Sequence, residues 1–152
     1  MEQRIDLMAT APGAMNSVLG IVKYLSTTNI DKTLNEVVSM RVSQINGCAY
    51  CLNMHATALR AKGYPQRNLD LLTAWREVDV YSVRERTALT WAEAVTLLPN
   101  KEVPDDVYEE VRKIFDEKDL GDLTLAITTI NTFNRFNIAF RNPPDFGANG
   151  TH

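Results

Sequence analysis

Apolar residues recur at spacings of three and four along most of the chain, and this periodicity constrains the fold more than any other feature. The repeat runs from Pro12 to Ser26 and again from Asp31 to Ile45. Such spacings place side chains on one face of an α-helix, whereas a strand alternates every second residue. No Asn-Gly pair lies between two alternating runs, as a β-hairpin would require. The sequence therefore predicts an all-α fold.

Residues that start or stop helices divide the rest of the chain into further segments. Asn46-Gly47 ends the second repeat, and Ser82 followed by Glu85 is typical of a capping box at a helix start. Further helices are expected over residues 48–63, 65–75, 82–98, 104–115 and 123–138. Gly121 is interpreted as a helix breaker, in a junction over residues 119–122 before the last of these helices.

Length and composition are those of a single soluble domain, with 152 residues, 45% of them apolar and 23% charged. We expect a bundle of six to seven helices over residues 1–142. A frayed tail is expected over residues 143–152, which begin with two prolines. Several predicted helices, notably residues 123–138, are apolar on more than one face. One small core would not cover those faces, so the sequence predicts a homo-oligomer.

Charge and hydropathy disfavour several functional classes. The net charge is −3, and no cluster of lysine and arginine marks a surface for nucleic acid or membrane. No apolar run approaches the roughly 18 residues that a membrane span needs. The first residues do not form a signal-peptide pattern. We therefore expect a cytoplasmic protein with no nucleic-acid or membrane partner.

All of the chain's thiols lie in one short segment. Cys48 and Cys51 are the only cysteines, and His55 follows the second; the other histidine, His152, is the last residue. If a helix begins near Gly47, the spacing puts both thiols and the imidazole on one helical face. The N–H groups of a helix start and a nearby imidazole lower the pKa of a thiol from its usual value of about 8.5. The segment therefore suits thiolate chemistry.

Position within the segment suggests different roles for the two sulfurs. Cys51 is best placed to lose its proton to His55, because helical side chains lean towards the N-terminus. Cys48 is placed to attack an oxidised Cys51 and close a disulfide. An inert buried pair is the structural alternative. It is disfavoured because the chain has no cysteine elsewhere.

Zinc binding is the competing chemistry for the same residues. Cys48, Cys51 and His55 could supply three ligands, with Glu36 or water as the fourth. A structural zinc site usually draws on a second Cys/His pair, which the chain lacks, so only a catalytic zinc site stays open. A c-type haem motif needs histidine where Leu52 stands, and a thioredoxin-like motif needs a βαβ setting.

Glu36, Cys48-x-x-Cys51 and His55 together resemble the signature of the carboxymuconolactone decarboxylase-like superfamily, and specifically of its alkylhydroperoxidase branch. That signature is a glutamate, a gap of eleven residues, a Cys-x-x-Cys pair and a histidine after three more, and all four positions match. The likeness is strongest over residues 35–63 and looser in the flanking helices. The resemblance implies an all-helical fold that assembles as an oligomer, commonly a trimer or hexamer.

The resemblance also implies an activity. Cys51 would reduce a hydroperoxide, Cys48 would resolve the product as a disulfide, and Glu36 and His55 would form a proton relay, with no cofactor or metal. A dithiol reductant of lipoyl or thioredoxin-like type would then reset the pair, entering at Cys48, which we expect to be the more exposed sulfur. The decarboxylase branch lacks paired cysteines, so the pair argues against lactone decarboxylation.

One position departs from the signature. A well-studied form of the peroxidase has a second histidine directly before its second cysteine, where this chain has Tyr50. We expect Tyr50 to line the site. A phenol is a poor proton shuttle at neutral pH because its pKa is near 10. The departure supports an alternative function, a dithiol–disulfide oxidoreductase or redox sensor with weak peroxidase activity.

Overall fold

The computed structural model describes residues 2–146, and helices make up its architecture. The α-helices are α1 (Leu7–Thr10), α2 (Pro12–Leu25), α3 (Lys32–Asn46), α4 (Ala49–Ala61), α5 (Gln66–Leu71), α6 (Val83–Leu97), α7 (Asp105–Arg112) and α8 (Glu117–Phe140). Two 3-10 helices, η1 (Leu72–Glu77) and η2 (Pro99–Lys101), follow α5 and α6. No strand occurs within residues 2–146, and the predicted all-α fold is confirmed. None of the helices in this range has the length and apolar character to cross a membrane.

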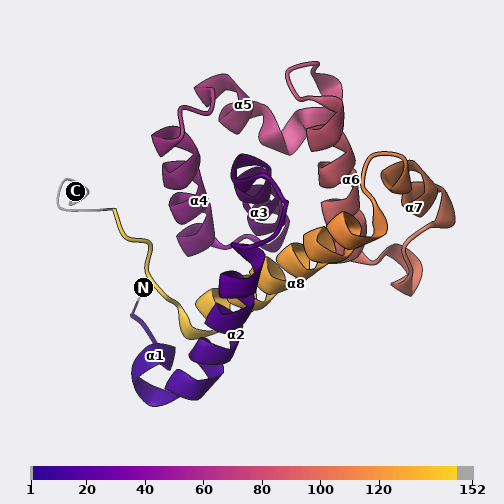
Figure 1. Cartoon of the computed structure of the whole chain (residues 1–152). Coiled ribbons are helices and arrows are strands. Elements are labelled where there is room, and N and C mark those ends of the chain that lie inside the picture. Colours follow the sequence, from indigo (N-terminus) through magenta and orange to yellow (C-terminus); the bar gives the residue numbers. More distant parts are fainter. Residues whose placement is uncertain (1, 147–152) are drawn as a thin grey trace.

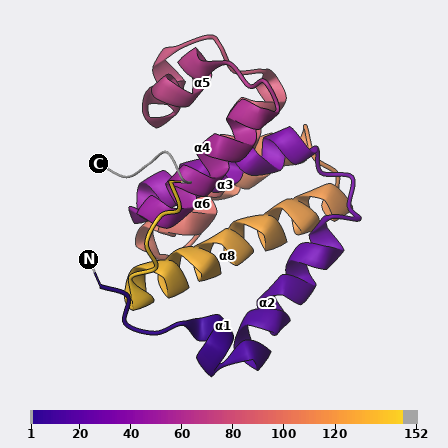
Figure 2. The same ribbon diagram turned by 90° about the vertical axis from the view of Figure 1, so that its left-hand side faces the viewer.

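Helix α3 lies inside the molecule, with α4, α6 and α8 packed around it (Figure 1). Helix α8 is the longest and passes beneath α3 and α6. Helix α2 runs beside α8 on its outer side (Figure 2). The segment before α1 returns to the far end of α8, where the Arg4 backbone N–H donates to the Phe140 carbonyl at 2.8 Å.

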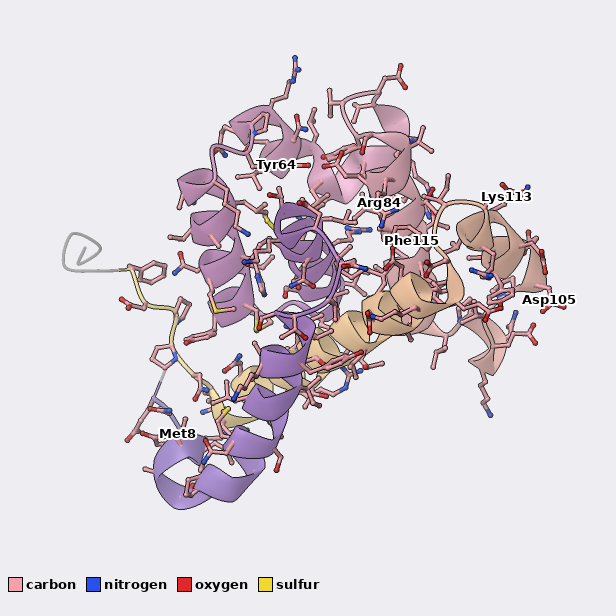
Figure 3. All side chains as sticks on the ribbon, in the orientation of Figure 1. Met8, Tyr64, Arg84, Asp105, Lys113 and Phe115 are labelled. Carbon is pink, nitrogen blue, oxygen red and sulfur yellow. A yellow bond between two sulfur atoms is a disulfide. The ribbon has the colours of Figure 1, made fainter. Side chains whose placement is uncertain are left out.

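Two clusters of buried apolar side chains form the core, and α3 contributes to both. Val38 and Val42 belong to a cluster with side chains of α6, α7 and α8, and Val37 belongs to a second cluster with side chains of α4, α5 and η1. All three are 0% exposed, and burying each contributes about 1.5–3 kcal/mol. Phe115, in the first cluster, lies where α7 approaches α6 and α8, with the Arg84 guanidinium 4.2 Å above its ring (Figure 3). Because α3 is buried on both sides, the neighbouring helices pack against it and take their positions from it.

Helix starts follow the capping residues that the sequence indicates. Asp31 accepts hydrogen bonds from the N–H groups of Thr33 and Leu34 at 2.9 and 2.8 Å, and so begins α3. Ser82 and Glu85 form the expected capping box: the Ser82 hydroxyl accepts from the Glu85 N–H at 3.2 Å, and the carboxylate accepts from the Ser82 N–H at 2.8 Å. These caps satisfy backbone donors that would otherwise lack partners.

The predicted junction over residues 119–122 is wrong. Helix α8 begins at Glu117 and continues through Gly121 without interruption. Its N-cap is Asp116, whose carboxylate accepts from the Asp119 N–H at 2.7 Å. Gly121 is exposed, and a glycine inside a helix costs only about 1 kcal/mol relative to alanine. Packing against α3 and α6 therefore outweighs its low helix propensity.

The helix expected over residues 65–75 is divided in two. Helix α5 ends at Leu71, and η1 follows with Ala74 in a non-helical conformation. Leu72 and Trp75, three residues apart, are both buried. The chain therefore bends between Leu72 and Trp75, and both side chains pack in the same buried cluster.

The structure adds a helix to the six to seven that the sequence predicts. Helix α1 is a single turn begun by Asp6, whose carboxylate accepts from the Ala9 N–H at 3.1 Å. After α8, residues 143–146 of the expected tail are not helical. The rest of that tail, residues 147–152, lies outside the described part of the chain, and the boundary at residue 142 stays a prediction.

Candidate functional site

The turn between α3 and α4 places the two cysteines. Gly47 ends α3 with a φ of 71°, a left-handed conformation that glycine adopts without strain. Cys48 follows as the N-cap of α4, and its sulfur accepts from the Cys51 N–H at 3.3 Å. The two residues are joined by a disulfide, with their Cα atoms 5.4 Å apart. The tight turn thus brings both sulfurs to the first turn of α4.

Both sulfurs are enclosed by the core. Cys48 is 1% exposed and Cys51 is 0% exposed. The expected greater exposure of Cys48 thus amounts to 1% against 0%, and both residues are buried. The reason is the packing of α4 against α8, which places both cysteines in the same cluster as Val38 and Val42.

The imidazole of His55 is held by a carboxylate from the neighbouring helix. Its Nδ1 lies 2.7 Å from Glu36 Oε2 across the α3–α4 contact, and Lys62 Nζ lies 3.8 Å from the other carboxylate oxygen. Burial alone would raise the pKa of Glu36, but the hydrogen bond and charge of His55, with the charge of Lys62, lower it below its ordinary value. Glu36 is therefore ionised at neutral pH and accepts a hydrogen bond from the Nδ1–H group of His55.

The other nitrogen of the same ring is Nε2. His55 Nε2 is buried and makes no hydrogen bond within the part of the chain that the structure describes. With Nδ1 donating to Glu36, Nε2 carries the lone pair of the neutral ring. A buried polar atom of this kind is costly, and His55 also lines the cavity described next, so Nε2 is the candidate proton acceptor of the site.

A cavity of about 580 Å³ opens beside this ring, between α2 and the helices α3, α4 and α8. Its polar wall includes His55, Glu36, Lys62 and Tyr50. Its apolar wall comes largely from α2 and α8, with Met8 of α1 at the α1–α2 end (Figure 3), and it includes Leu19, Val22, Ile130 and Phe133. A mostly apolar cavity with a few converging polar groups is the usual form of a small-molecule site.

The sequence analysis did not predict one of the side chains that contact the Cys51 sulfur. Asn137 of α8 is buried, lines the cavity and donates from Nδ2 to Cys51 Sγ at 3.2 Å. The signal in the sequence is the series Asn131, Asn134 and Asn137, which recur at a spacing of three. Asn134 has a structural role, because it links α8 to Ser43 of α3 at 3.0 Å. Only Asn137 contacts a cysteine.

The four residues of the predicted motif thus lie around one small region. Glu36 bonds His55, and Cys48 bonds Cys51, while the catalytic roles assigned to them stay predictions. Within residues 2–146, no group of three or more His, Cys, Asp or Glu side chains is arranged to hold a metal ion. The zinc alternative therefore has no observation in its favour.

The chain is similar in sequence to a known protein family and to a bacterial protein of nearly the same length. Residues 10–94 match the sequence profile of the carboxymuconolactone decarboxylase family. The protein YdfG of Bacillus subtilis (strain 168), itself uncharacterized, is 41% identical over 142 residues, covering 93% of this chain and 97% of its own.

Two crystal structures share the fold. One, from Agrobacterium tumefaciens, is a protein of unknown function described as a candidate AhpD antioxidant-defence protein. It has a TM-score of 0.91 and 32% identity, and the match covers 96% of this chain and 100% of that one. The other, from Ralstonia eutropha JMP134, is a peroxidase-related protein with an alkylhydroperoxidase AhpD core. Its TM-score is 0.80 at 20% identity over 91% of this chain and 74% of that one, a likeness of fold alone.

Proposed function

This chain belongs to the carboxymuconolactone decarboxylase family, and from that premise we propose that it is a thiol-dependent peroxidase that reduces hydroperoxides through Cys48 and Cys51. The observation that carries this function is the Cys48–Cys51 disulfide, one helical turn from His55. Glu36 holds Nδ1 of that histidine, and its Nε2 has no hydrogen-bond partner among residues 2–146. The Agrobacterium tumefaciens protein, 32% identical and described as a candidate AhpD antioxidant-defence protein, supports the same class of reaction.

In the reduced protein, His55 Nε2 accepts the proton of the Cys51 thiol. The two residues are one turn apart on α4 and share a face of the helix. Glu36 stabilises the resulting imidazolium through Nδ1 and keeps the ring in one orientation, as in other sets of nucleophile, base and orienting carboxylate. The cysteine becomes a thiolate, the form that reacts with peroxides.

The thiolate then attacks the terminal oxygen of the hydroperoxide, and the O–O bond breaks. Cys51 becomes a sulfenic acid, and the leaving alkoxide takes the proton held by His55 and departs as an alcohol. The Cys48 sulfur attacks the sulfenic acid, a disulfide forms, and water is released. An external dithiol, of lipoyl or thioredoxin-like type, reduces that disulfide by exchange and is itself oxidised.

The cavity suits an organic hydroperoxide better than hydrogen peroxide alone. Its walls include Leu19, Val22, Ile130 and Phe133, so an apolar substituent on the peroxide is removed from water when it binds. The peroxide group would then lie at the polar end, beside His55 and Tyr50. Burial of both sulfurs limits contact between the reactive thiolate and water.

Steady-state turnover of an organic hydroperoxide with a dithiol reductant tests this function. Cys51→Ser is expected to abolish turnover, because the attacking sulfur is lost. Cys48→Ser is expected to react once with peroxide and then fail to form the disulfide. Full turnover by Cys51→Ser would show that the chemistry has been assigned to the wrong sulfur.

Tyr50 favours a second candidate, a dithiol–disulfide oxidoreductase or redox sensor. It occupies the position where a well-studied peroxidase carries a histidine, and it lines the cavity. A reversible Cys48–Cys51 couple together with negligible peroxide consumption would support this candidate over the first. Replacement of Tyr50 by histidine would then raise the rate with peroxide.

A further inference from the structure

We propose that Asn137 is a positioning residue of the redox centre, whose amide N–H stabilises the Cys51 thiolate and whose orientation is fixed by a relay of amides that ends at a backbone carbonyl. Asn137 Nδ2 lies 3.2 Å from Cys51 Sγ. Both side chains are buried, at 9% and 0% exposure. In such surroundings a hydrogen bond to an anion is stronger than one to a neutral thiol, because little water competes for it.

The direction of the amide matters because its two ends have opposite effects. An N–H group facing the sulfur stabilises a thiolate, whereas the amide oxygen in the same place would repel it. The oxygen is engaged elsewhere: Asn137 Oδ1 accepts from Asn142 Nδ2 at 2.7 Å. That bond alone does not settle the direction, since both amides could be turned together.

The N-terminal segment removes this ambiguity. Asn142 Oδ1 accepts from Gln3 Nε2 at 2.8 Å, and the same Gln3 nitrogen donates to the Ile5 carbonyl at 3.3 Å. A backbone carbonyl can only accept, so the Gln3 amide has one orientation. Each following amide is then oriented in turn, and the last one directs its N–H groups at Cys51.

Backbone contacts hold this relay in place. The Arg4 guanidinium donates to the Ala139 carbonyl at 3.2 Å, next to the backbone bond from Arg4 to Phe140. Helix α8 ends at Phe140, its C-cap Arg141 has a φ of 57°, and the Asn142 N–H donates to the Asn137 carbonyl at 3.0 Å. Residues near both ends of the described chain are therefore linked, through Asn142 and Asn137, to the buried sulfur of Cys51.

The inference rests on the proposed function in one respect: it matters to catalysis only if Cys51 reacts as a thiolate. Asn137 would then act at two steps, before attack on the peroxide and during reduction of the disulfide. When a dithiol thiolate attacks Cys48, the S–S bond breaks and its electron pair leaves on Cys51. Stabilising that leaving group favours attack on Cys48 over attack on Cys51.

A titration of Cys51 alone tests the inference without any peroxide. The chain has two cysteines, so in a Cys48→Ser background the thiolate absorbance reports a single group. We expect Asn137→Ala to raise the pKa of Cys51 by about one unit, a roughly tenfold loss of thiolate below that pKa. Asn137→Asp places a carboxylate at the sulfur and is expected to raise the pKa further.

Asn134→Ala is the matched control, because it removes a buried amide of the same helix that does not contact a cysteine. It should lower the melting temperature and leave the Cys51 pKa unchanged. If Asn137→Ala does not fold, Asn142→Ala replaces it, since that half-buried residue only orients the amide. An unchanged Cys51 pKa in either folded variant overturns the inference, whatever the peroxidase assay gives.

Discussion

The Glu36 carboxylate bonds Nδ1 of His55, the ring nitrogen opposite Nε2. Replacing Glu36 therefore tests the orientation of the ring separately from proton transfer at Nε2. Glu36→Gln keeps the shape of the side chain and loses the charge that stabilises an imidazolium. We expect kcat/KM for an organic hydroperoxide to fall by about 100-fold, within the range typical of general acid–base groups. Glu77→Gln, an exposed glutamate on η1, is the control and should retain full activity. Equal activity in the two variants would remove Glu36 from the relay.

The lowered pKa of Glu36 also predicts how stability depends on pH. A carboxyl whose pKa is lower in the folded state contributes stability above its unfolded pKa, about 4.3, and loses it as pH falls through the folded pKa. Wild-type protein should therefore lose stability relative to Glu36→Gln below about pH 5. Urea unfolding at pH 7 and pH 4 gives the free energy of unfolding of the wild-type protein and of Glu36→Gln. A difference that stays constant over this range contradicts the lowered pKa.

The sequence predicted local chemistry better than long-range contacts at the site. Glu36, Cys48, Cys51 and His55 lie on two consecutive helices, so their spacing alone implies proximity once the helices are recognised. Asn137 could not be found in this way, because 86 positions separate it from Cys51 and only tertiary packing joins them. The burial of Cys48 was missed for the same reason.

Helix α8 continues through Gly121 because packing stabilises the helix. Replacing this glycine by a residue of higher helix propensity should therefore increase the stability of the protein. No neighbouring atom lies within 4 Å of a Cβ built there, and its φ is not positive. Gly121→Ala should raise the free energy of unfolding by about 0.5–1 kcal/mol. Gly47→Ala is the contrasting variant and should destabilise, because φ is 71° at that position. Urea denaturation of both variants distinguishes a continuous helix from the predicted break.

Helix boundaries were predictable where a side chain caps the backbone and less so elsewhere. Asp31 and Ser82 act within three residues of themselves, and their helices begin where expected. The break predicted at Gly121 is wrong because the low helix propensity of one residue costs less free energy than burial of the surrounding helix gains. The change from α5 to η1 depends on where Leu72 and Trp75 meet the core, which spacing alone does not specify.

Apolar side chains that remain exposed on α2 and α8 predict assembly, and two of them, Leu19 and Val22, lie at the wall of the cavity. Leu19 and Val22 remain 40% and 41% exposed although both are apolar, and Ile138 of α8 is 47% exposed. We propose that a second copy of the chain covers part of this surface. Light scattering is expected to give a mass of three or six times the 17.1 kDa of one chain. A single 17.1 kDa species at all concentrations would contradict it.

The arrangement of the whole chain was predictable only in outline. Periodicity indicates the helical class and most of its elements, because each helix is a local structure. The cavity is different, since it forms where α2 approaches α8, more than 80 residues later in the chain. No local pattern indicates that these two helices would enclose the space beside His55. The proposed cytoplasmic location likewise depends on composition and not on the fold.

Mass spectrometry of the reduced protein after brief exposure to an organic hydroperoxide tests the proposed peroxidase chemistry most directly. In Cys48→Ser, sulfenic acid is expected on Cys51, and in the wild-type protein a Cys48–Cys51 disulfide should replace it. Cys51→Ser should leave Cys48 reduced over the same interval. Oxidation of Cys48 in that variant at the wild-type rate, or no oxidation of the wild-type protein, would contradict the account.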